Sequence, residues 1–215
     1  MDYRSLHRIA NSDLSEFRAH IFGEKQYKPA AAFAFGSALH TLILEPQAVV
    51  SVPADVDLSL CMMLARIARN YPFVAWALRF SQKERVQLWQ DTATGLELKS
   101  RLDIVHKNSL VVDLKSTSCK SYADFLRSCE TYDYDRQAAF YLDAIGGKKF
   151  VFVAIQKVAP YTIWTVEHHT DGPFIQAGRR KYKALLREWK RRTDAGTPFV
   201  PTSWNHQLQT DPALC

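Results

Sequence analysis

The stretch RLDIVHKNSLVVDLKST, from Arg101 to Thr117, decides the fold. It predicts two strands, Leu96 to Val105 and Leu110 to Lys115, joined by a hairpin loop at His106 to Ser109. Side chains alternate between the two faces of a strand. On the first strand the apolar face takes Leu96, Leu98, Leu102 and Ile104, and the other face takes Glu97, Lys99, Arg101 and Asp103. On the second strand the corresponding sets are Leu110, Val112 and Leu114, and Val111, Asp113 and Lys115. We expect the apolar faces to pack on one core and Asp103 and Asp113 to share the polar face.

The polar face of this hairpin has the composition of a metal site. With the loop centred near Lys107 and Asn108, Asp103 lies opposite Asp113 or one residue from it, and cross-strand neighbours are ~4.5–5.5 Å apart. Two carboxylates this close repel unless a positive charge lies between them. A divalent cation with oxygen ligands supplies that charge, and Lys115 could orient or deprotonate a water. A structural ion pair between Asp113 and Lys115 is the alternative, and the hairpin alone leaves both open.

The acid-x-Lys pattern also occurs elsewhere, as Glu97-x-Lys99 and Glu188-x-Lys190. Glu97-x-Lys99 is a real competitor, because Asp91 lies across a predicted turn at Thr94-Gly95. We favour Asp113-x-Lys115 because its strand is more apolar and therefore more buried, and a buried acid and lysine require partners.

Outward from the hairpin, the chain alternates blocks of helices and strands. Helices are predicted from a cap at Asn11-Ser12-Asp13 to Phe22, and over Ala30–Leu44, Leu58–Arg69, Phe73–Phe80, Tyr122–Cys129, Tyr134–Ile145 and Phe174–Arg192. Further strands are predicted over Val86–Gln90, Phe150–Lys157 and Thr162–Glu167. This order is a mixed α/β layout. We expect one domain over 1–215, with a helical part at 1–80, a sheet with helices at 81–170, a basic helix at 171–193 and an irregular tail at 194–215.

Charge is concentrated in the last predicted helix. The chain has 28 basic and 22 acidic residues, a net charge of +6. Eight basic residues and one acid lie between Arg179 and Arg192, so this segment carries +7 and the remainder −1. A basic strip on a neutral protein favours a polyanionic partner, although a solvated helix face is the alternative.

Composition narrows the class of protein. Hydrophobic residues make up 47% and charged residues 23%, as in soluble globular proteins. No apolar run approaches the ~20 residues of a membrane helix, and the first residues do not form a secretion signal, so we expect a cytoplasmic protein without a membrane partner. Four scattered cysteines (Cys61, Cys119, Cys129 and Cys215) favour reduced thiols over an iron–sulfur or zinc site.

Three segments, in this order, carry a family resemblance: GSALHTLILEP (Gly36–Pro46), the hairpin, and RQAAFYLDA (Arg136–Ala144). Together they resemble the RecE-type exonuclease VIII branch of the PD-(D/E)XK nucleases, which is related to lambda exonuclease and the RecB nuclease domain. The resemblance covers about Tyr3 to Val158. It implies a restriction-endonuclease-like α+β core, in which a central mixed sheet is flanked by helices in αβββαβ order.

The resemblance also implies roles for single residues. Asp103 and Asp113 match the two metal-binding acids, and the Leu114 carbonyl and His40 match further ligands. Lys115 matches the motif lysine, although many relatives have Glu where Asp113 stands. Gln137 and Tyr141, which share one helical face, match a Q-x-x-x-Y motif that helps to position DNA or the active site. The metal would be Mg²⁺, and Mn²⁺ should substitute because the ligands are oxygens and one imidazole.

The implied activity is a Mg²⁺-dependent exonuclease that hydrolyses linear double-stranded DNA from its ends, 5′→3′, in phage or prophage recombination. The implied partners are a single-strand annealing protein and two or three further copies in a homo-oligomeric ring. An endonuclease, or a repair or defence nuclease on the same core, is one alternative, and a non-catalytic DNA-binding module is another.

Candidate DNA contacts are Lys99, Arg101 and the basic helix. For the DNA end the candidates are Ser12, Arg18 and Ser37, whose simpler roles are a helix cap, a solvated charge and a packing residue.

Overall fold

The computed structural model describes residues 3, 5–24 and 30–204. The described helices are α1 (Asn11–Phe22), α2 (Ala30–Leu44), α3 (Leu58–Asn70), α4 (Pro72–Phe80), α5 (Tyr122–Thr131), α6 (Tyr134–Ile145) and α7 (Pro173–Asp194). The described strands are β1 (Gln82–Gln90), β2 (Glu97–His106), β3 (Leu110–Thr117), β4 (Lys149–Gln156) and β5 (Ile163–His169). Cys215 and half of the predicted tail (205–215) lie outside the described residues.

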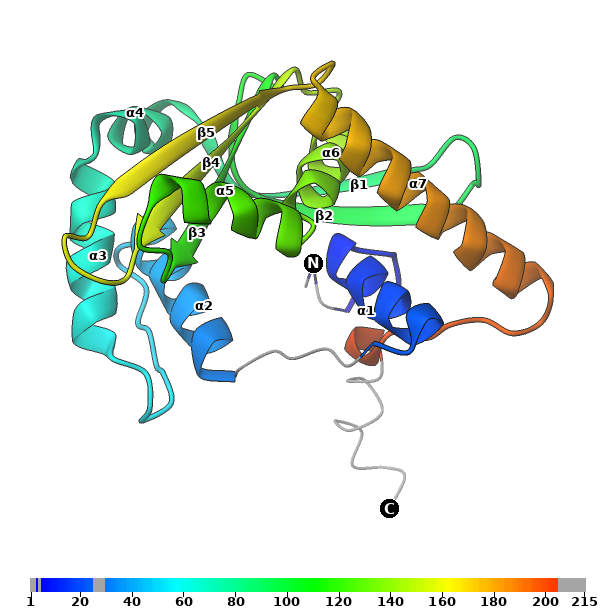
Figure 1. Cartoon of the computed structure of the whole chain (residues 1–215), viewed down its shortest axis with the longest axis horizontal. Coiled ribbons are helices and arrows are strands. Elements are labelled where there is room, and N and C mark those ends of the chain that lie inside the picture. The colour runs from blue at the N-terminus through cyan, green and yellow to red at the C-terminus, as the bar shows by residue number, and fades with distance from the viewer. Residues whose placement is uncertain (1–2, 4, 25–29, 205–215) are drawn as a thin grey trace.

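One mixed sheet organises the molecule (Figure 1). Its strand order is β1-β2-β3-β4-β5, and every neighbouring pair is antiparallel except β3 and β4, which are parallel. Helices α5 and α6 form the crossover that this parallel pair requires. The expected fold class, an α+β fold with a central mixed sheet flanked by helices, is confirmed.

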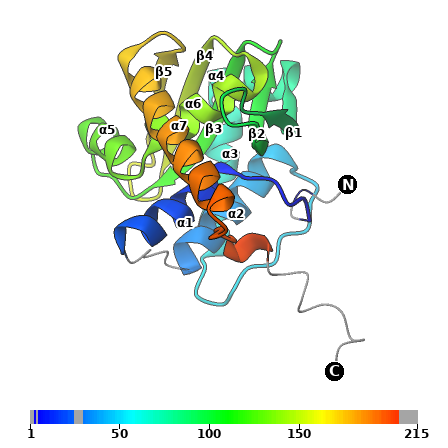
Figure 2. The same ribbon diagram turned by 90° about the vertical axis from the view of Figure 1, so that its right-hand side faces the viewer.

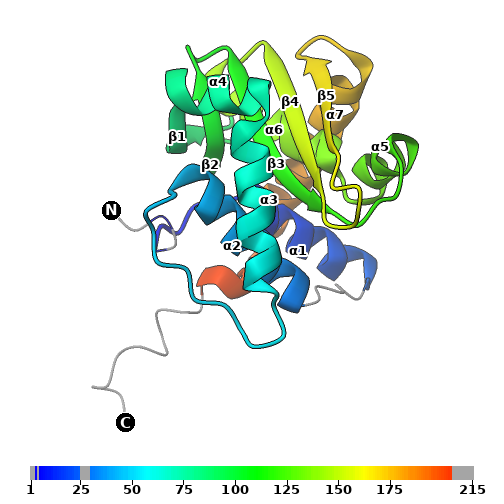
Figure 3. The ribbon, with the colours of Figure 1, turned by 90° about the vertical axis from the view of Figure 1, so that its left-hand side faces the viewer.

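Helices cover the sheet on both faces (Figures 2 and 3). Helices α2, α3 and α4 share one hydrophobic cluster with Val112, Leu114 and Val151 of the sheet. Helices α1, α5, α6 and α7 share another with Leu98, Val111 and Phe152. Burial on both faces goes with an apolar run in β4 from Phe150 to Ile155, as in strands that are covered on both sides.

Two-sided burial corrects the expectation that the hairpin packs on a single core. Leu102 lies in the cluster of α6 and α7, whereas Ile104 lies with α2 and α3. The alternation breaks between them. The pairing of β1 with β2 leaves out Glu84 and Asp103, and Glu84 has a left-handed φ of 49°. Asp103 therefore occupies an irregular position in β2, next to the site described below.

Two boundaries differ from expectation for physical reasons. Strand β1 begins at Gln82, four residues before the predicted start, because its polar first half pairs with the far end of β2 on the outer edge of the sheet. Helix α1 begins at Asn11 with Ala10 in the cap position, and the Asp13 carboxylate accepts the Ala10 N–H at 2.8 Å. Ser12 is therefore not the cap. No described helix is long and apolar enough to cross a membrane.

Helices α6 and α7 approach each other closely at Gly178. A Cβ at this position would lie 1.9 Å from the Asp135 carbonyl oxygen, which is backbone and cannot rotate away. At Gly36, inside α2, a Cβ would lie 3.6 Å from the Ser116 hydroxyl, an ordinary contact. Of these two helical glycines, only Gly178 is required by packing.

The matched substitutions should therefore have opposite effects on stability. We expect Gly178→Ala to lower the free energy of unfolding by about 1–3 kcal/mol, because α7 must move away from α6. Gly36→Ala should raise it by about 0.5–1 kcal/mol, because alanine loses less entropy in a helix. Urea unfolding followed by circular dichroism measures both, and a Gly178→Ala protein as stable as the wild type would contradict the close approach.

Candidate functional site

The site lies where β2 and β3 separate. Their ladder runs from His106↔Leu110 to Ile104↔Val112 and then stops, one pair before Asp103 would meet Asp113. The Asp103 carboxylate accepts the Leu114 N–H at 2.8 Å in place of a backbone bond. Further along, β2 bridges to Ile9 instead of β3. Because the N–H and C=O of an extended residue point to the same edge, the Leu114 carbonyl also faces this opening.

Both helical layers contribute a side chain to the opening. His40 comes from α2, and its Nδ1 lies 3.4 Å from Oδ2 of Asp103. Gln137 comes from α6 in the opposite layer, and its Nε2 donates to Oδ1 of Asp113 at 3.0 Å. The interrupted ladder thus gives the two layers access to the same pair of carboxylates.

Lys115 completes a closed arrangement with Asp113 and Gln137. Its Nζ lies 2.6 Å from Oδ2 of Asp113 and donates to Oε1 of Gln137 at 2.9 Å. The Gln137 amide therefore has a fixed orientation, with its oxygen toward the lysine and its nitrogen toward the acid. Asp113 has only 3% of its side chain exposed, so these contacts take the place of water.

Aromatic rings of α6 border this arrangement. Tyr141 is half-buried one turn from Gln137, and burial and the charge of Asp113 raise its pKa, opposed by a hydrogen bond with Gln137. Tyr134 lies on the same helical stripe, and Lys115 Nζ is 4.7 Å from its ring centroid. Tyr134 was not singled out from the sequence, although its spacing from Gln137 and Tyr141 indicates that it shares their face.

Charge compensation sets the protonation states. Burial raises the pKa of Asp113 to about 6, with Lys115 opposing the shift and Asp103 adding to it. Burial also acts to raise the pKa of Asp103, but His40 and the Leu114 N–H outweigh it, and the pKa falls below its ordinary value. Burial lowers the pKa of His40, yet the charge of Asp103 reverses this and the net shift is upward. The pKa of Lys115 is raised in the same way, because the charge of Asp113 outweighs burial.

The competing hairpin does not form a site. The Asp91 carboxylate accepts the N–H and hydroxyl of Thr94 and so closes a turn. Glu97 is exposed and pairs with Arg8 at 2.9 Å. Lys99 is buried and donates to the carbonyl oxygens of Tyr3 and Leu6 at 3.1 and 2.7 Å. These three side chains have separate partners, so the choice of Asp113-x-Lys115 agrees with the geometry.

The candidate DNA contacts come from three elements, α1, α2 and β2. Lys99 supports the N-terminal segment through its backbone contacts, which does not fit a role in gripping phosphates. Arg101 is half-exposed and pairs with Glu84 at 3.0 Å, and Arg18 pairs with Glu24 at 2.8 Å. Ser12 and Ser37 are exposed on α1 and α2.

Most of the charge of the basic helix is already paired. Arg179 bonds Asp143 and Lys181 bonds Asp133 and Asp135, while Lys190, Arg191 and Arg192 pair with acids of α7 itself. Among the described residues, Arg180, Lys183 and Arg187 form no ion pair. Their spacing places them on one stripe, opposite the stripe of Tyr182, Leu186 and Trp189 that packs on the core.

The donor set fits a hard divalent cation. It offers two carboxylates, a carbonyl and one imidazole, which suit Mg²⁺ or Mn²⁺. Oδ2 of Asp113 is buried and accepts no hydrogen bond of good geometry despite its proximity to Lys115, and a buried oxygen of this kind calls for a partner. Within the described part of the chain, no three His, Cys, Asp or Glu side chains already converge on one point. Each carboxylate instead faces its own cationic side chain.

Comparison with known proteins agrees with this geometry. The family described as "PDDEXK-like domain of unknown function (DUF3799)" matches residues 59–195, which include both acids, Lys115, Gln137 and Tyr141. No curated protein matches the chain.

Several solved structures are similar in fold to this chain. A candidate exonuclease from Eubacterium rectale is similar at 16% identity and a TM-score of 0.64, over 94% of this chain and 88% of its own. A phage-related exonuclease from Haemophilus somnus 129PT has 11% identity and a TM-score of 0.47, over 86% and 82% of the two chains. An alkaline exonuclease from Laribacter hongkongensis has 12% identity and a TM-score of 0.45, over 89% and 95%. At this identity the first of them shows a common fold and nothing finer.

The two acids should titrate separately, each governed by its own partner. Carbon-13 NMR of labelled aspartate should find Asp113 near pH 6 and Asp103 below its ordinary range. Lys115→Gln should raise the pKa of Asp113, because it removes the nearest positive charge, and His40→Gln should raise the pKa of Asp103 for the same reason. If both acids titrate near ~3.9 in all three proteins, the charge compensation described here is wrong.

Proposed function

Because this chain belongs to the PDDEXK-like family DUF3799, within the PD-(D/E)XK nuclease superfamily, we propose that it hydrolyses DNA phosphodiesters with bound Mg²⁺ at the opening between β2 and β3. One observation carries the proposal: the buried carboxylate of Asp113 and the partly buried carboxylate of Asp103 face the interrupted ladder, and each is paired with a different side chain, Asp103 with His40 and Asp113 with Lys115. The two carboxylates supply the negative charge that a bound cation needs, and the same opening could admit a phosphate.

The chain's own residues define what happens there. Asp103, Asp113, the Leu114 carbonyl and a neutral His40 would hold the ion, which supplies positive charge to the phosphate and acidifies a bound water. His40 would have to be neutral to hold a metal, whereas its raised pKa favours the protonated form beside Asp103. Lys115 keeps its proton, since its pKa is raised, and donates to the water or to a phosphate oxygen instead of acting as a base.

Gln137 and the rings of α6 hold Lys115 in place. The Gln137 carbonyl oxygen accepts from Nζ at 2.9 Å, and the Tyr134 ring lies 4.7 Å from it, a favourable contact for a cation. Neither of these two contacts depends on Asp113, so both would persist with Asp113 as a metal ligand. Lys115 can then stabilise charge that develops at the phosphate without a change of position.

The finer proposal is an exonuclease that degrades linear double-stranded DNA 5′→3′ in phage-type recombination, as a ring of three or four copies with a single-strand annealing partner. Its support is the resemblance of three sequence segments to RecE-type enzymes and the shared fold with the Eubacterium rectale protein. An endonuclease, or a repair or defence enzyme, on the same core remains the second candidate. It uses the same site chemistry and differs in how DNA enters.

Loss of one acid should abolish cutting. With Mg²⁺ and a linear duplex, we expect Asp113→Asn to lower the rate at least about 100-fold, because it removes a charge that acts in the transition state. Glu97→Gln is the matched control, an acid two residues before a lysine but outside the site, and should cut at the wild-type rate. Circular dichroism confirms that both variants fold. The assignment fails if Glu97→Gln is inactive while Asp113→Asn cuts normally.

The form of the substrate separates the two nuclease classes. An exonuclease should degrade a linear duplex and spare the same sequence as a covalently closed circle, whereas an endonuclease should cut both. Comparing 5′-phosphorylated with 5′-hydroxyl ends, and a label at either end, gives polarity and end requirement in the same experiment. Digestion of the closed circle at the rate of the linear duplex would overturn the exonuclease proposal.

Metal binding should compete with protons. Asp113, with a pKa of about 6, and His40, with a raised pKa, must both be deprotonated to bind. As the pH falls through this range, each acquired proton should weaken the apparent affinity for Mn²⁺ by about tenfold per pH unit. Electron paramagnetic resonance of Mn²⁺ titrated without DNA between pH 5 and 8 (chosen to bracket ~6.5, the ordinary pKa of histidine) measures this. His40→Gln should remove one proton from the dependence, and an affinity independent of pH would contradict the ligand set.

A further inference from the structure

An exposed aromatic ring lies one contact away from the residues that border Lys115. Tyr132, between α5 and α6, is 65% exposed. Its ring centroid is 5.9 Å from that of Tyr134, with an angle of 33° between the planes. Tyr134 in turn stacks on Phe152 and lies 4.7 Å from Lys115 Nζ. A row of rings thus leads from the buried sheet, past the lysine, to solvent.

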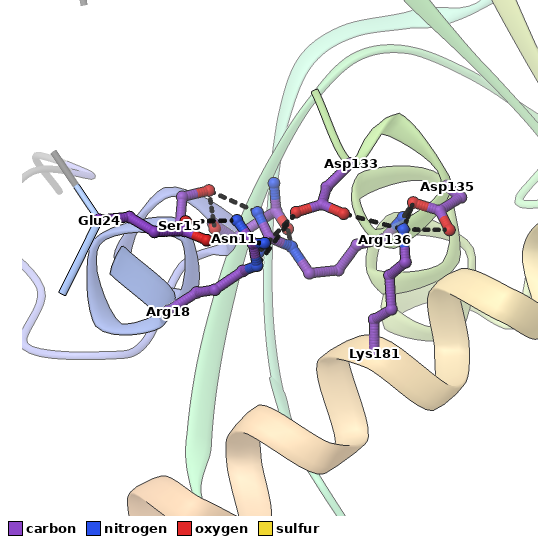
Figure 4. A network of polar contacts seen from close by, with 8 residues as sticks. All are labelled: Asn11, Ser15, Arg18, Glu24, Asp133, Asp135, Arg136 and Lys181. Carbon is purple, nitrogen blue, oxygen red and sulfur yellow. Dashed lines mark hydrogen bonds and ion pairs between the residues drawn. The ribbon is translucent and has the colours of Figure 1, made fainter. Parts of the chain in front are cut away.

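The turn that carries Tyr132 is held firmly (Figure 4). Asp133 follows it with a left-handed φ of 52°, a conformation that costs a non-glycine residue energy. The Asp133 carboxylate accepts from Lys181 of α7 at 2.8 Å and lies 3.7 Å from Arg136 of α6 and 3.9 Å from Arg18 of α1. On the other side, the Tyr132 N–H donates to the Ser128 carbonyl at 3.0 Å. Three helices therefore fix the backbone of a side chain that itself has little packing.

Folding alone does not account for this ring. A tyrosine that is two-thirds exposed contributes little buried area, and a rigid exposed aromatic presents contact area at low entropic cost. Beside a site that binds the DNA backbone, the flat partner at hand is a nucleobase. Stacking of bases on aromatic side chains is how proteins bind single strands without regard to sequence.

Resting on the nuclease function proposed above, we propose that Tyr132 is a stacking platform for an unpaired base near the phosphate held at Lys115. The two contacts in the row are 5.9 and 4.7 Å, so the Tyr132 ring lies within about three ~3.4 Å steps along a DNA strand of the lysine. The row of rings joins Tyr132 to Lys115 Nζ, the positive charge that the proposed function places at the phosphate. A nucleic acid is therefore favoured over an apolar protein segment as the occupant.

This placement also specifies the kind of DNA. Inside a duplex both faces of every base are covered by neighbouring base pairs, so a protein ring can stack only on the last pair or on an unpaired base. Tyr132 thus selects DNA ends or single-stranded tails over continuous duplex. It is a positioning residue, because it touches the substrate's base and not the reacting phosphate.

The test compares two 5′-labelled duplexes that differ only in the three terminal nucleotides of the cut strand, which either carry bases or are abasic. Binding is measured by fluorescence anisotropy with Ca²⁺ in place of Mg²⁺, and cutting with Mg²⁺. For the wild type we expect abasic ends to weaken binding about 5- to 150-fold, the range for loss of one stacked base. Tyr132→Ala should lose the same factor on the intact duplex and nothing more on the abasic one, and Tyr132→Phe should match the wild type.

A matched control separates stacking from a general effect of removing an exposed ring. Phe80, at the end of α4 on the opposite face of the sheet, is 56% exposed, and Phe80→Ala should bind both duplexes as the wild type does. If Tyr132→Ala is weakened further by abasic ends, or binds the intact duplex normally, the stacking role is refuted although the nuclease function stands. A wild type that neither binds nor cuts either duplex, in a folded state, refutes both.

Discussion

The constraint behind this structure is that two neighbouring carboxylates, one buried and one partly buried, each need a positive partner of their own. Asp103 and Asp113 belong to neighbouring strands at positions that the hairpin register places opposite each other. Left unpartnered at such a distance they would repel. The chain meets this constraint by ending the β2–β3 ladder one pair early, so that Asp103 takes the Leu114 N–H and His40, while Asp113 takes Lys115 and Gln137. The partners come from opposite helical layers, which is why the sheet is enclosed on both faces at this point.

The alignment of Asp103 with Asp113 was predictable, because the geometry of a hairpin follows from local rules. Strand alternation and a two-residue turn, at which Lys107 and Asn108 adopt left-handed φ, are enough to align Asp103 with Asp113. The break in alternation between Leu102 and Ile104 was not predictable, since it arises from Glu84 on another strand. The start of β1 was also not predictable, because its residues are polar and show no hydrophobic alternation. Its extended conformation is set by backbone pairing with β2, which does not depend on the type of side chain.

The basic helix shows how a count of charges can mislead. In the sequence alone, the segment from Arg179 to Arg192 carries a net charge of +7, which favours a polyanionic partner. In the fold, the side chains of Arg179 and Lys181 reach acids on α6 and the turn before it, and Glu188 and Asp194 bind three more cations within α7. The pairs made by Arg179 and Lys181 hold α7 against α6, and the Lys181 pair helps to fix the turn at Asp133. Tertiary contacts therefore convert much of an apparent binding surface into structural support, and the charge left for a partner is the stripe of Arg180, Lys183 and Arg187.

Function in this fold is divided between residues with strong sequence signals and residues without them. Acids, a histidine and a lysine attract notice because their burial needs a reason, whereas a tyrosine in a helix is ordinary. Tyr134 becomes informative only when its ring is found beside Lys115, and Tyr132 only when it is found exposed on a turn that three helices hold in a strained conformation. In the proposed function, the charged centre acts on any phosphodiester that reaches it. Internal phosphates carry no information about sequence or strandedness, so neutral surfaces around that centre can add selection, because the exposed face of an unpaired base distinguishes a tail from the interior of a duplex.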